Sequence, residues 1–363
     1  MIKVPQYIKS LKAYKPGKPI EEIKKEFGLD EVAILWNNEN NFGASPKAIA
    51  EVKKALETSH LYPDPLSQKL REKIAKKLGK KPDNIICGNG SESLLMNILK
   101  AFCSGDDELV TSEGSFVIIY IWSMINDVPC VTVPMTEDYR FDMEGILRRI
   151  NSKTKVIYLP NANNPTGSMI TREELETFLR KLPDHILVVL DEAYFEYSEI
   201  LHEDFPNSLN FNYPNILTLR TFSKAYGIAG NRVGYAVGHE DIIEPLMKVK
   251  LTFEPSNLAQ AAGLGAMDDT DFLKKTIENN KSGLDYFYRE FGRLGLKYFK
   301  SYANFVMVDF ETEERANEIF NELMKRGVFV RQLPAFGLPQ CIRISVGLPK
   351  ENELCVAMLK EIL

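Results

Sequence analysis

Two cationic side chains, Lys224 and Arg232, stand eight residues apart in the segment TFSKAYGIAGNR (221–232), among small and apolar neighbours. The segment runs directly into the apolar, strand-like sequence VGYAVG. A lysine buried at such a place costs free energy unless an anion or a covalent partner meets it. Thr221 and Ser223 add two hydroxyl groups, which are donors that suit a phosphate. The segment therefore indicates a site for an anionic or covalently attached ligand.

Three other polar groups follow apolar runs that are typical of buried strands. In ICGNGSES, glycines precede Ser91 and Glu92 at the expected start of a helix, where free N–H groups and the helix dipole favour a phosphate. Asn164 lies in YLPNANNPTG, and in VVLDEAY Asp191 directly follows an apolar run, with Tyr194 three residues further on. Each group alone can be explained without a functional role, as a turn, a helix cap or a solvated side chain. Because all of them follow strands expected to end at one edge of the same sheet, we interpret them as one site.

An anion cradle, a buried carboxylate, an amide, a phenol and a lysine together match the chemical requirements of pyridoxal 5′-phosphate (PLP). The aldehyde of PLP forms a Schiff base with a lysine, and its ring nitrogen needs a carboxylate partner to stay protonated. Its phenolate oxygen accepts hydrogen bonds, and its phosphate accepts them from N–H groups, hydroxyls and arginine. The sequence therefore predicts PLP as the cofactor. No metal site is expected.

The elements that must position these groups alternate along the chain. Strands are predicted at 84–87, 108–111, 130–133, 155–159, 186–190, 215–219 and 233–238. Helical patterns between them predict a mostly parallel sheet covered on both faces, with ligands beyond the carboxyl ends of its strands. After about residue 255 a long helical region (257–293) is followed by strands at 305–310, 328–331 and 341–347, which indicates a smaller α+β domain.

Composition narrows the class of protein and its surroundings. The 363 residues exceed what one core usually serves, so we expect an N-terminal arm (1–35), a large PLP-binding domain (36–255) and a small C-terminal domain (256–363). A net charge of −5 argues against nucleic acid as the main partner. Five cysteines without a C-x-x-C pair fit a reducing compartment. With no signal peptide and no apolar run long enough for a membrane, we predict a cytoplasmic protein.

The chain resembles the fold-type I PLP-dependent aminotransferases, specifically the histidinol-phosphate aminotransferase family. The matching segments are YKPGKP, NNENNFGASPKA, LYPD, NNPTG, VVLDEAYFEY, TFSKAYGIAGNRVGY and CIRISVG, which together run through nearly all of the sequence. The resemblance implies an α/β large domain with a mostly parallel seven-stranded sheet, and a smaller α+β domain at the C-terminus. The motifs around Lys224 and Asp191 are specific for the cofactor and much less specific for the substrate.

The resemblance also implies a role for each matched residue. Lys224 is expected to form the Schiff base and then to move a proton, while Asp191 pairs with the ring nitrogen; with Tyr194 they form the expected catalytic set. The further cofactor contacts implied are Asn164 and Tyr194 at the ring oxygen, Phe116 stacked on the ring, and Ser91, Glu92, Thr221, Ser223 and Arg232 at the phosphate. Tyr62 matches a tyrosine that reaches the phosphate from a neighbouring subunit, which implies a homodimer with shared sites.

Two arginines near the C-terminus bear on the substrate. In CIRISV the alternation of apolar residues places Arg343 on the opposite face, and Arg331 ends the strand-like VFVR; either arginine can simply be solvated. The resemblance implies that both hold a substrate phosphate, together with Tyr14, and that Asn164 also contacts the substrate. The implied reaction converts L-histidinol phosphate and 2-oxoglutarate into imidazole acetol phosphate and L-glutamate, a step of histidine biosynthesis.

The sequence departs from the family pattern at three positions. Asn41 replaces a proline, Gly114 stands where proline is usual, and Phe116 often is a tyrosine. Phenylalanine keeps the stacking surface and loses only a hydroxyl, so the departures concern the substrate more than the cofactor.

Other functions stay open at this point. Within PLP chemistry, an aromatic amino-acid aminotransferase or a threonine-phosphate decarboxylase uses the same cofactor residues. GNGSES after a strand also suggests an NAD-dependent oxidoreductase, but the third glycine of that fingerprint is missing and the reading leaves Lys224 and Asp191 unused. A non-catalytic protein that kept the fold is disfavoured by the same two residues.

Overall fold

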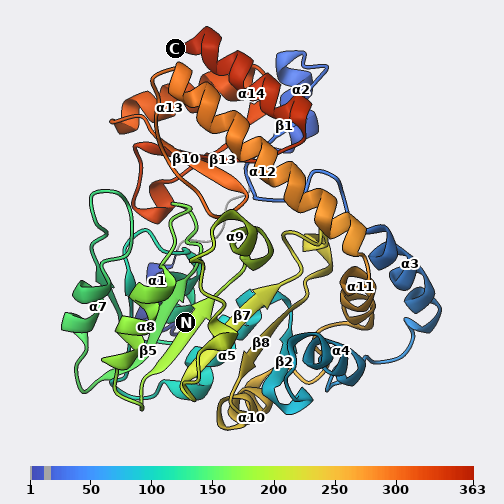
Figure 1. Ribbon diagram of the computed structural model, residues 1–363, viewed down its shortest axis with the longest axis vertical. Coiled ribbons are helices and arrows are strands. Elements are labelled where there is room, and N and C mark those ends of the chain that lie inside the picture. The colour runs from blue at the N-terminus through green and yellow to red at the C-terminus, as the bar shows by residue number, and fades with distance from the viewer. Residues whose placement is uncertain (1, 12–17) are drawn as a thin grey trace.

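A computed structural model describes residues 2–11 and 18–363 of the chain (Figure 1). Tyr14 lies outside the described residues. A large body built on a seven-stranded sheet lies below a smaller body that contains the C-terminus (Figure 1). Within the described ranges, no helix combines the length and the apolarity that crossing a membrane requires.

The central sheet has the strand order β2-β8-β7-β6-β5-β3-β4. Its strands are β2 (Ile85–Gly88), β3 (Glu108–Ser112), β4 (Cys130–Val133), β5 (Thr154–Pro160), β6 (Leu187–Asp191), β7 (Ile216–Thr221) and β8 (Gly234–Gly238). Every strand but β8 runs in the same direction, because β8 pairs antiparallel with both β2 and β7 while the other pairs are parallel. The structure thus confirms the expected mostly parallel, seven-stranded sheet.

The reversed direction of β8 explains the segment that carries Lys224 and Arg232. β7 ends at Thr221 and β8 begins at Gly234, so both of these strand ends lie at the same edge of the sheet. The connection between them stays at that edge, which is also where the parallel strands β2, β5 and β6 end. All the polar groups that follow these strands are therefore brought to one side of the sheet.

Helices cover both faces of the sheet, as a parallel sheet buried on both sides requires. Neighbouring residues of β5 alternate between two cores: Val156 and Tyr158 pack in one, Ile157 and Leu159 in the other. The first core also contains residues of α5 (Gly90–Phe102), α6 (Ile118–Ile125) and α10 (Glu240–Val249). The opposite face is covered by α7 (Met143–Arg149) and α8 (Arg172–Arg180), and toward β2 by α4 (Gln68–Leu78) and α11 (Asn257–Met267).

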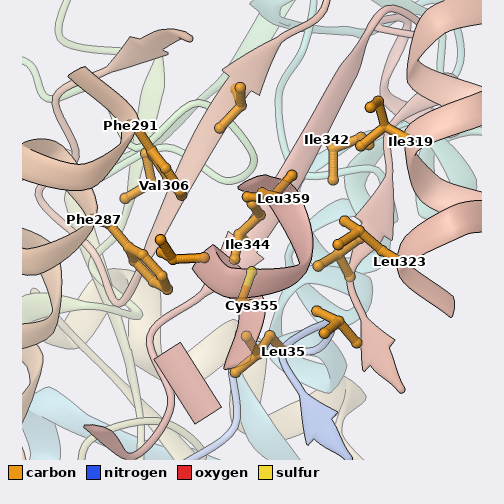
Figure 2. Packing of buried hydrophobic residues seen from close by; sticks show 14 of the residues in the cluster. Leu35, Phe287, Phe291, Val306, Ile319, Leu323, Ile342, Ile344, Cys355 and Leu359 are labelled. Atoms are coloured by element: carbon orange, nitrogen blue, oxygen red, sulfur yellow. The ribbon is translucent and has the colours of Figure 1, made fainter. Parts of the chain in front are cut away.

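The smaller body is an antiparallel sheet packed against helices. The sheet has the order β12-β13-β10-β9, with β9 (Lys297–Phe299), β10 (Phe305–Asp309), β12 (Arg331–Gln332) and β13 (Cys341–Ser345). Figure 2 shows how Phe287 and Phe291 of α12 (Thr270–Arg293) pack with Val306 and Ile344 of the sheet. Further residues of this core come from α13 (Glu313–Lys325) and α14 (Pro349–Ile362). This arrangement matches the expected α+β part.

The N-terminal region runs along both bodies. α1 (Gln6–Ser10) contacts α6 of the large body, and β1 (Ala33–Ile34) pairs in parallel with β11 (Val328–Phe329) of the small one. Leu35 belongs to the core of the small body (Figure 2). α2 (Ile20–Phe27), α3 (Pro46–Ala55) and α9 (Phe195–Leu201) complete the helices described here. The division of the chain into an arm and two domains stays a prediction.

Two expected elements are each divided in two. The helical region 257–293 breaks at Asp269, whose Oδ2 accepts hydrogen bonds from the hydroxyl of Ser45 and the backbone N–H of Lys47. The strand expected at 328–331 splits into β11 and β12, which pair with different strands. In both cases residues from distant segments form hydrogen bonds with the expected element and divide it. A local sequence pattern contains no information about such distant partners.

The close packing of α11 on α3 generates a first prediction. A Cβ atom added at Gly265 would lie 2.4 Å from the carbonyl oxygen of Lys47, whereas one added at Gly292 of α12 would meet no atom within 4 Å. Gly265→Ala should therefore lower the free energy of unfolding by roughly 2 kcal/mol, because two backbones must move apart. Gly292→Ala should raise it by about 0.5–1 kcal/mol, because alanine favours the helix. Urea denaturation of both variants measures this, and equal signs would contradict it.

Candidate active site

A cleft opens at the sheet edge where the polar groups converge. It is lined by Asn37, Glu39, Ser91, Glu92, Phe116, Tyr158, Pro160, Ala162, Asn164, Asp191, Ala193, Tyr194, Thr221, Ser223, Lys224, Ala229 and Arg232. The structure thus brings together every residue expected at the cofactor except Tyr62. The lining residues come from six segments far apart in the chain; five of these segments follow parallel strands of the central sheet, whose shared direction brings them together, and the sixth carries Asn37 and Glu39.

Lys224 extends its amine into this cleft. The side chain is half-buried; its Nζ donates to the backbone oxygen of Asn37 at 3.2 Å and lies 5.8 Å from the centre of the Tyr194 ring. Desolvation, with smaller contributions from the positive charges of Arg343 and Arg232, lowers the pKa of Lys224 to about 8. Part of the amine population is therefore neutral near neutral pH, as a nucleophile or base requires.

Asp191 is a buried carboxylate with one unsatisfied oxygen. Its Oδ2 accepts a hydrogen bond of 2.8 Å from the hydroxyl of Tyr158, but Oδ1 has no partner among the described residues. Burial raises the pKa of Asp191 to about 6. A buried acceptor without a donor costs free energy, so this oxygen fits a ligand that presents an N–H group. The protonated ring nitrogen of PLP is such a donor.

The start of α5 and the β7–β8 connection form an anion cradle. Gly90 has φ +76°, and a Cβ there would lie 2.6 Å from Nη2 of Arg232, so glycine allows the arginine to approach. Nη1 of Arg232 lies 3.4 Å from Oγ of Ser223, and the hydroxyl of Thr221 donates to the same Oγ at 2.9 Å. A guanidinium, two hydroxyls and a helix N-terminus in one place suit a phosphate. The residues present therefore fit PLP at both ends.

The two arginines of the small body lie side by side on one face of its sheet. Arg331 of β12 is the direct cross-strand partner of Arg343 of β13, so their side chains share a face. Arg343 is buried, and its guanidinium donates to Oδ1 of Asn164 and to the backbone oxygen of Trp36. Its Nε has no partner in the described part of the chain, and burial lowers the pKa of Arg343 to about 10.

Paired like charges of this kind destabilise a sheet unless an anion lies between them. The pair stands next to the cleft because Asn164, to which Arg343 donates, lines it. The two arginines therefore suit a second anionic group beside the cofactor.

Among the described residues expected at the site, Tyr62, Arg331 and Arg343 do not line this cleft. Tyr14 lies outside the described residues, and Tyr62 is 80% exposed, with its ring stacked on Phe253 at 4.3 Å. Tyr62 does not reach the cleft of its own chain.

Sequence reasoning missed Tyr158, which holds Asp191, and Glu39, which lines the cleft. The sequence pattern predicts Tyr158 only as a strand residue, and the one signal of a further role is that the hydroxyl of a tyrosine within a buried strand needs a partner. Glu39 follows no predicted strand, so the rule that placed the other residues did not apply to it.

Comparison with known proteins gives a consistent result. The family pattern of class I and II aminotransferases matches residues 31–357. Histidinol-phosphate aminotransferase 2 of Carboxydothermus hydrogenoformans is 41% identical over 359 residues, with 98% of each chain covered. The histidinol-phosphate aminotransferase of Bacillus velezensis is 39% identical over the full length of both chains. A crystal structure of the Sinorhizobium meliloti enzyme in complex with PLP superposes with a TM-score of 0.89 at 31% identity, covering 100% of this chain and 98% of that one.

The unsatisfied oxygen of Asp191 generates a second prediction, for the cofactor-free protein. Above about pH 6 the carboxylate is charged in both the folded and the unfolded state, and the folded state carries the desolvation penalty. Asp191→Asn should therefore raise the free energy of unfolding at pH 7.5 by on the order of 2–3 kcal/mol. The gain should shrink as the pH falls from about 6, because the native carboxyl then takes up a proton.

Chemical denaturation across pH 4–8 tests this, with the exposed Asp184→Asn as a control that changes stability little. A variant that is less stable than the parent protein at pH 7.5 would show that Asp191 is already satisfied in the folded state.

Proposed function

The chain belongs to the class I and II aminotransferase family, and we propose that it transfers the amino group of L-histidinol phosphate to 2-oxoglutarate. The products are imidazole acetol phosphate and L-glutamate, and the reaction is a step of histidine biosynthesis. PLP is the cofactor. The observation that carries the phosphate substrate is the pair of Arg331 and Arg343, directly opposite each other beside the cleft. Relatives named for the same reaction over nearly their full length support it.

The residues of the cleft divide the work of holding the cofactor. When bound, PLP supplies an electron sink for the substrate carbon that loses its proton. Asp191 would keep the ring nitrogen protonated through Oδ1, and the cradle of Ser223, Arg232 and the α5 N-terminus would hold the phosphate. Ser91, Glu92 and Thr221 belong to the same cradle and Phe116 to the ring-stacking wall in this proposal.

Lys224 and Asn164 act on the reacting side. Nζ of Lys224 accepts and returns the proton, for which its lowered pKa of about 8 prepares it. Asn164 receives a hydrogen bond from Arg343 at Oδ1, so its Nδ2 remains available to donate into the cleft. The residue that would grip the substrate anion thus also orients a cofactor donor.

The substrate side must accept both a phosphate and a dicarboxylate. Each guanidinium presents several donors in a fixed fork, which reads either anion by bidentate contacts. Arg331 is half-buried and Arg343 buried, so contacts to them are shielded from solvent. Tyr14 is proposed to assist at the phosphate.

We further propose that two copies of the chain form a homodimer with shared sites. Large apolar side chains are exposed on two segments joined by the stacked rings of Tyr62 and Phe253; the exposed set is Leu61, Tyr62, Leu66, Leu251 and Phe253. Such a patch fits burial against a second copy. Tyr62 of one copy would then reach the phosphate cradle of the other copy. We place the enzyme in the cytoplasm, which its five unpaired cysteines support.

A substrate panel on the PLP-loaded enzyme tests the reaction and generates a third prediction. Histidinol phosphate should be the best amino donor, ahead of histidinol, phenylalanine and tyrosine, and threonine phosphate should release no CO₂. Arg331→Gln should lower kcat/KM for histidinol phosphate by about 10²-fold, the size of a lost charge-assisted contact, and leave histidinol almost unchanged.

Arg326→Gln is the matched control, since that arginine pairs with Glu322 on α13. A clear preference for phenylalanine would make the enzyme an aromatic amino-acid aminotransferase instead.

The shared site generates a fourth prediction. Lys224→Ala and Tyr62→Ala should each give a weak or inactive homodimer. When the two variants are co-expressed, each mixed dimer should contain one doubly defective site and one intact site, because Lys224 and Tyr62 of one intact site come from different chains. Activity of the purified mixed dimer should therefore approach half that of the parent enzyme. Activity no higher than that of the Tyr62→Ala homodimer would mean that each chain completes its own site.

A further inference from the structure

Asn38 is a buried amide that joins three separate parts of the molecule. It follows β1, is 1% exposed and has φ 56°, a left-handed conformation that asparagine adopts more readily than most residues. Its side chain contacts Tyr194, which precedes α9, and Ser345, the last residue of β13. No catalytic or binding role follows for Asn38 from the sequence motifs used above.

The hydrogen bonds around Asn38 have a fixed direction. Its backbone N–H donates to Oγ of Ser345 at 3.0 Å, and the hydroxyl of Ser345 donates to Oδ1 of Asn38 at 2.9 Å. Nδ2 then donates to the hydroxyl oxygen of Tyr194 at 2.9 Å. In the structure the serine hydroxyl gives its proton to Oδ1 of Asn38, and the NH₂ group of the amide faces the tyrosine, which leaves each proton of this set with an acceptor.

This direction decides where the proton of Tyr194 points. A tyrosine hydroxyl has one proton, and in this chain of bonds its oxygen is an acceptor, so the proton stays free for another acceptor. Tyr194 lines the cleft, beside Lys224 and Asp191. Burial raises the pKa of Tyr194, against a partial lowering by Arg343 and by the hydrogen bond from Asn38, so the hydroxyl keeps its proton. With the amide reversed, Oδ1 would draw that proton away from the cleft.

We propose that Asn38 is a positioning residue that turns the hydroxyl proton of Tyr194 toward the ring oxygen of the cofactor. The inference rests on the proposed role of Tyr194 as a donor to that oxygen. It adds a residue to the site that touches neither the cofactor nor the substrate and acts through the tyrosine.

The same contacts tie this proton to the strand that carries the substrate arginine. Ser345 is two residues from Arg343 on β13, and its backbone N–H donates to the oxygen of Leu35 at 2.9 Å. Nδ2 of Asn304 donates to the backbone oxygen of Asn38 at 3.2 Å. The segment 35–38 is therefore fastened to the small body, and Asn38 reaches from it to Tyr194. β13 thus controls two donors to the cofactor, one through Asn38 and one through Arg343 and Asn164.

The experiment is a pH titration of the visible absorption of bound PLP. A donor to an ionised ring oxygen favours the ionised form, so its loss raises the pH midpoint of the absorption change. Tyr194→Phe should raise the midpoint by about one pH unit. Asn38→Gly, which tolerates the left-handed backbone, should raise it by roughly half a unit, and Ser345→Ala should shift it less in the same direction.

The double variant separates positioning from a general structural role. In the Tyr194→Phe background there is no hydroxyl to orient, so Asn38→Gly should add no further shift. Asn280→Ala is the control, because that buried amide donates at 3.1 Å to the backbone oxygen of Ala303, outside the cleft, and its loss should lower stability without moving the midpoint. Urea denaturation of the cofactor-free variants verifies that all of them fold.

Other results would contradict either the role of Asn38 or that of Tyr194. An equal shift from Asn38→Gly with and without the Tyr194 hydroxyl, or no shift with the hydroxyl present, overturns the role of Asn38 and leaves the proposed reaction intact. No shift from Tyr194→Phe removes the proposed role of Tyr194 and this inference with it.

Discussion

The buried carboxylate of Asp191, one oxygen of which finds no donor among residues 2–11 and 18–363, is the constraint around which this site is built. A buried charge without a counter-ion is unfavourable, and contacts from neighbouring residues keep this carboxylate in its buried position. Tyr158 of the neighbouring strand fixes one oxygen. The next residue, Glu192, forms a buried ion pair of 2.7 Å with Arg220 of β7, and Arg220 lies over the ring of Phe195 at 3.4 Å. This ion pair holds the ends of β6 and β7 together. It therefore fixes the position of Asp191 relative to the segment that begins at Thr221.

The two bodies are not independent carriers of cofactor and substrate. Arg343 belongs to the small sheet, yet it orients the amide of Asn164 in the large one. Ser345, on the same strand, acts on Tyr194 through Asn38. In the proposed site, a displacement of β13 would move Arg343 and would change the hydrogen bonds that hold Asn164 and Asn38. If the proposed roles hold, these direct contacts would link substrate binding to the hydrogen bonds that the cofactor receives.

The sequence predicted the parts of this site that depend on strand direction alone. Lys224, Asp191 and Asn164 each follow an apolar run, and parallel strands bring their carboxyl ends to one edge whatever the exact register. The sequence does not predict Tyr158 and Asn38 as site residues, because the role of each depends on a hydrogen-bond partner on another element. The same reason explains why the helical region 257–293 is divided: Asp269 accepts hydrogen bonds from residues at the start of α3. Local pattern fixes the type of an element, and long-range competition for hydrogen bonds fixes its ends.

Substrate specificity is harder to predict than the cofactor for a related physical reason. PLP requires a lysine, a carboxylate and an anion cradle in one place, and few other arrangements satisfy all three together. The substrate requires only cationic donors at a suitable separation, which many surfaces provide. Arg331 and Arg343 acquire meaning from the antiparallel register that sets them opposite each other, and from the burial that lowers the pKa of Arg343 to about 10. Neither the register nor the burial can be derived from the sequence of the eleven residues between the two arginines. A buried arginine and a half-buried one, held opposite each other by a sheet, therefore favour an anion-binding site over two solvated arginines.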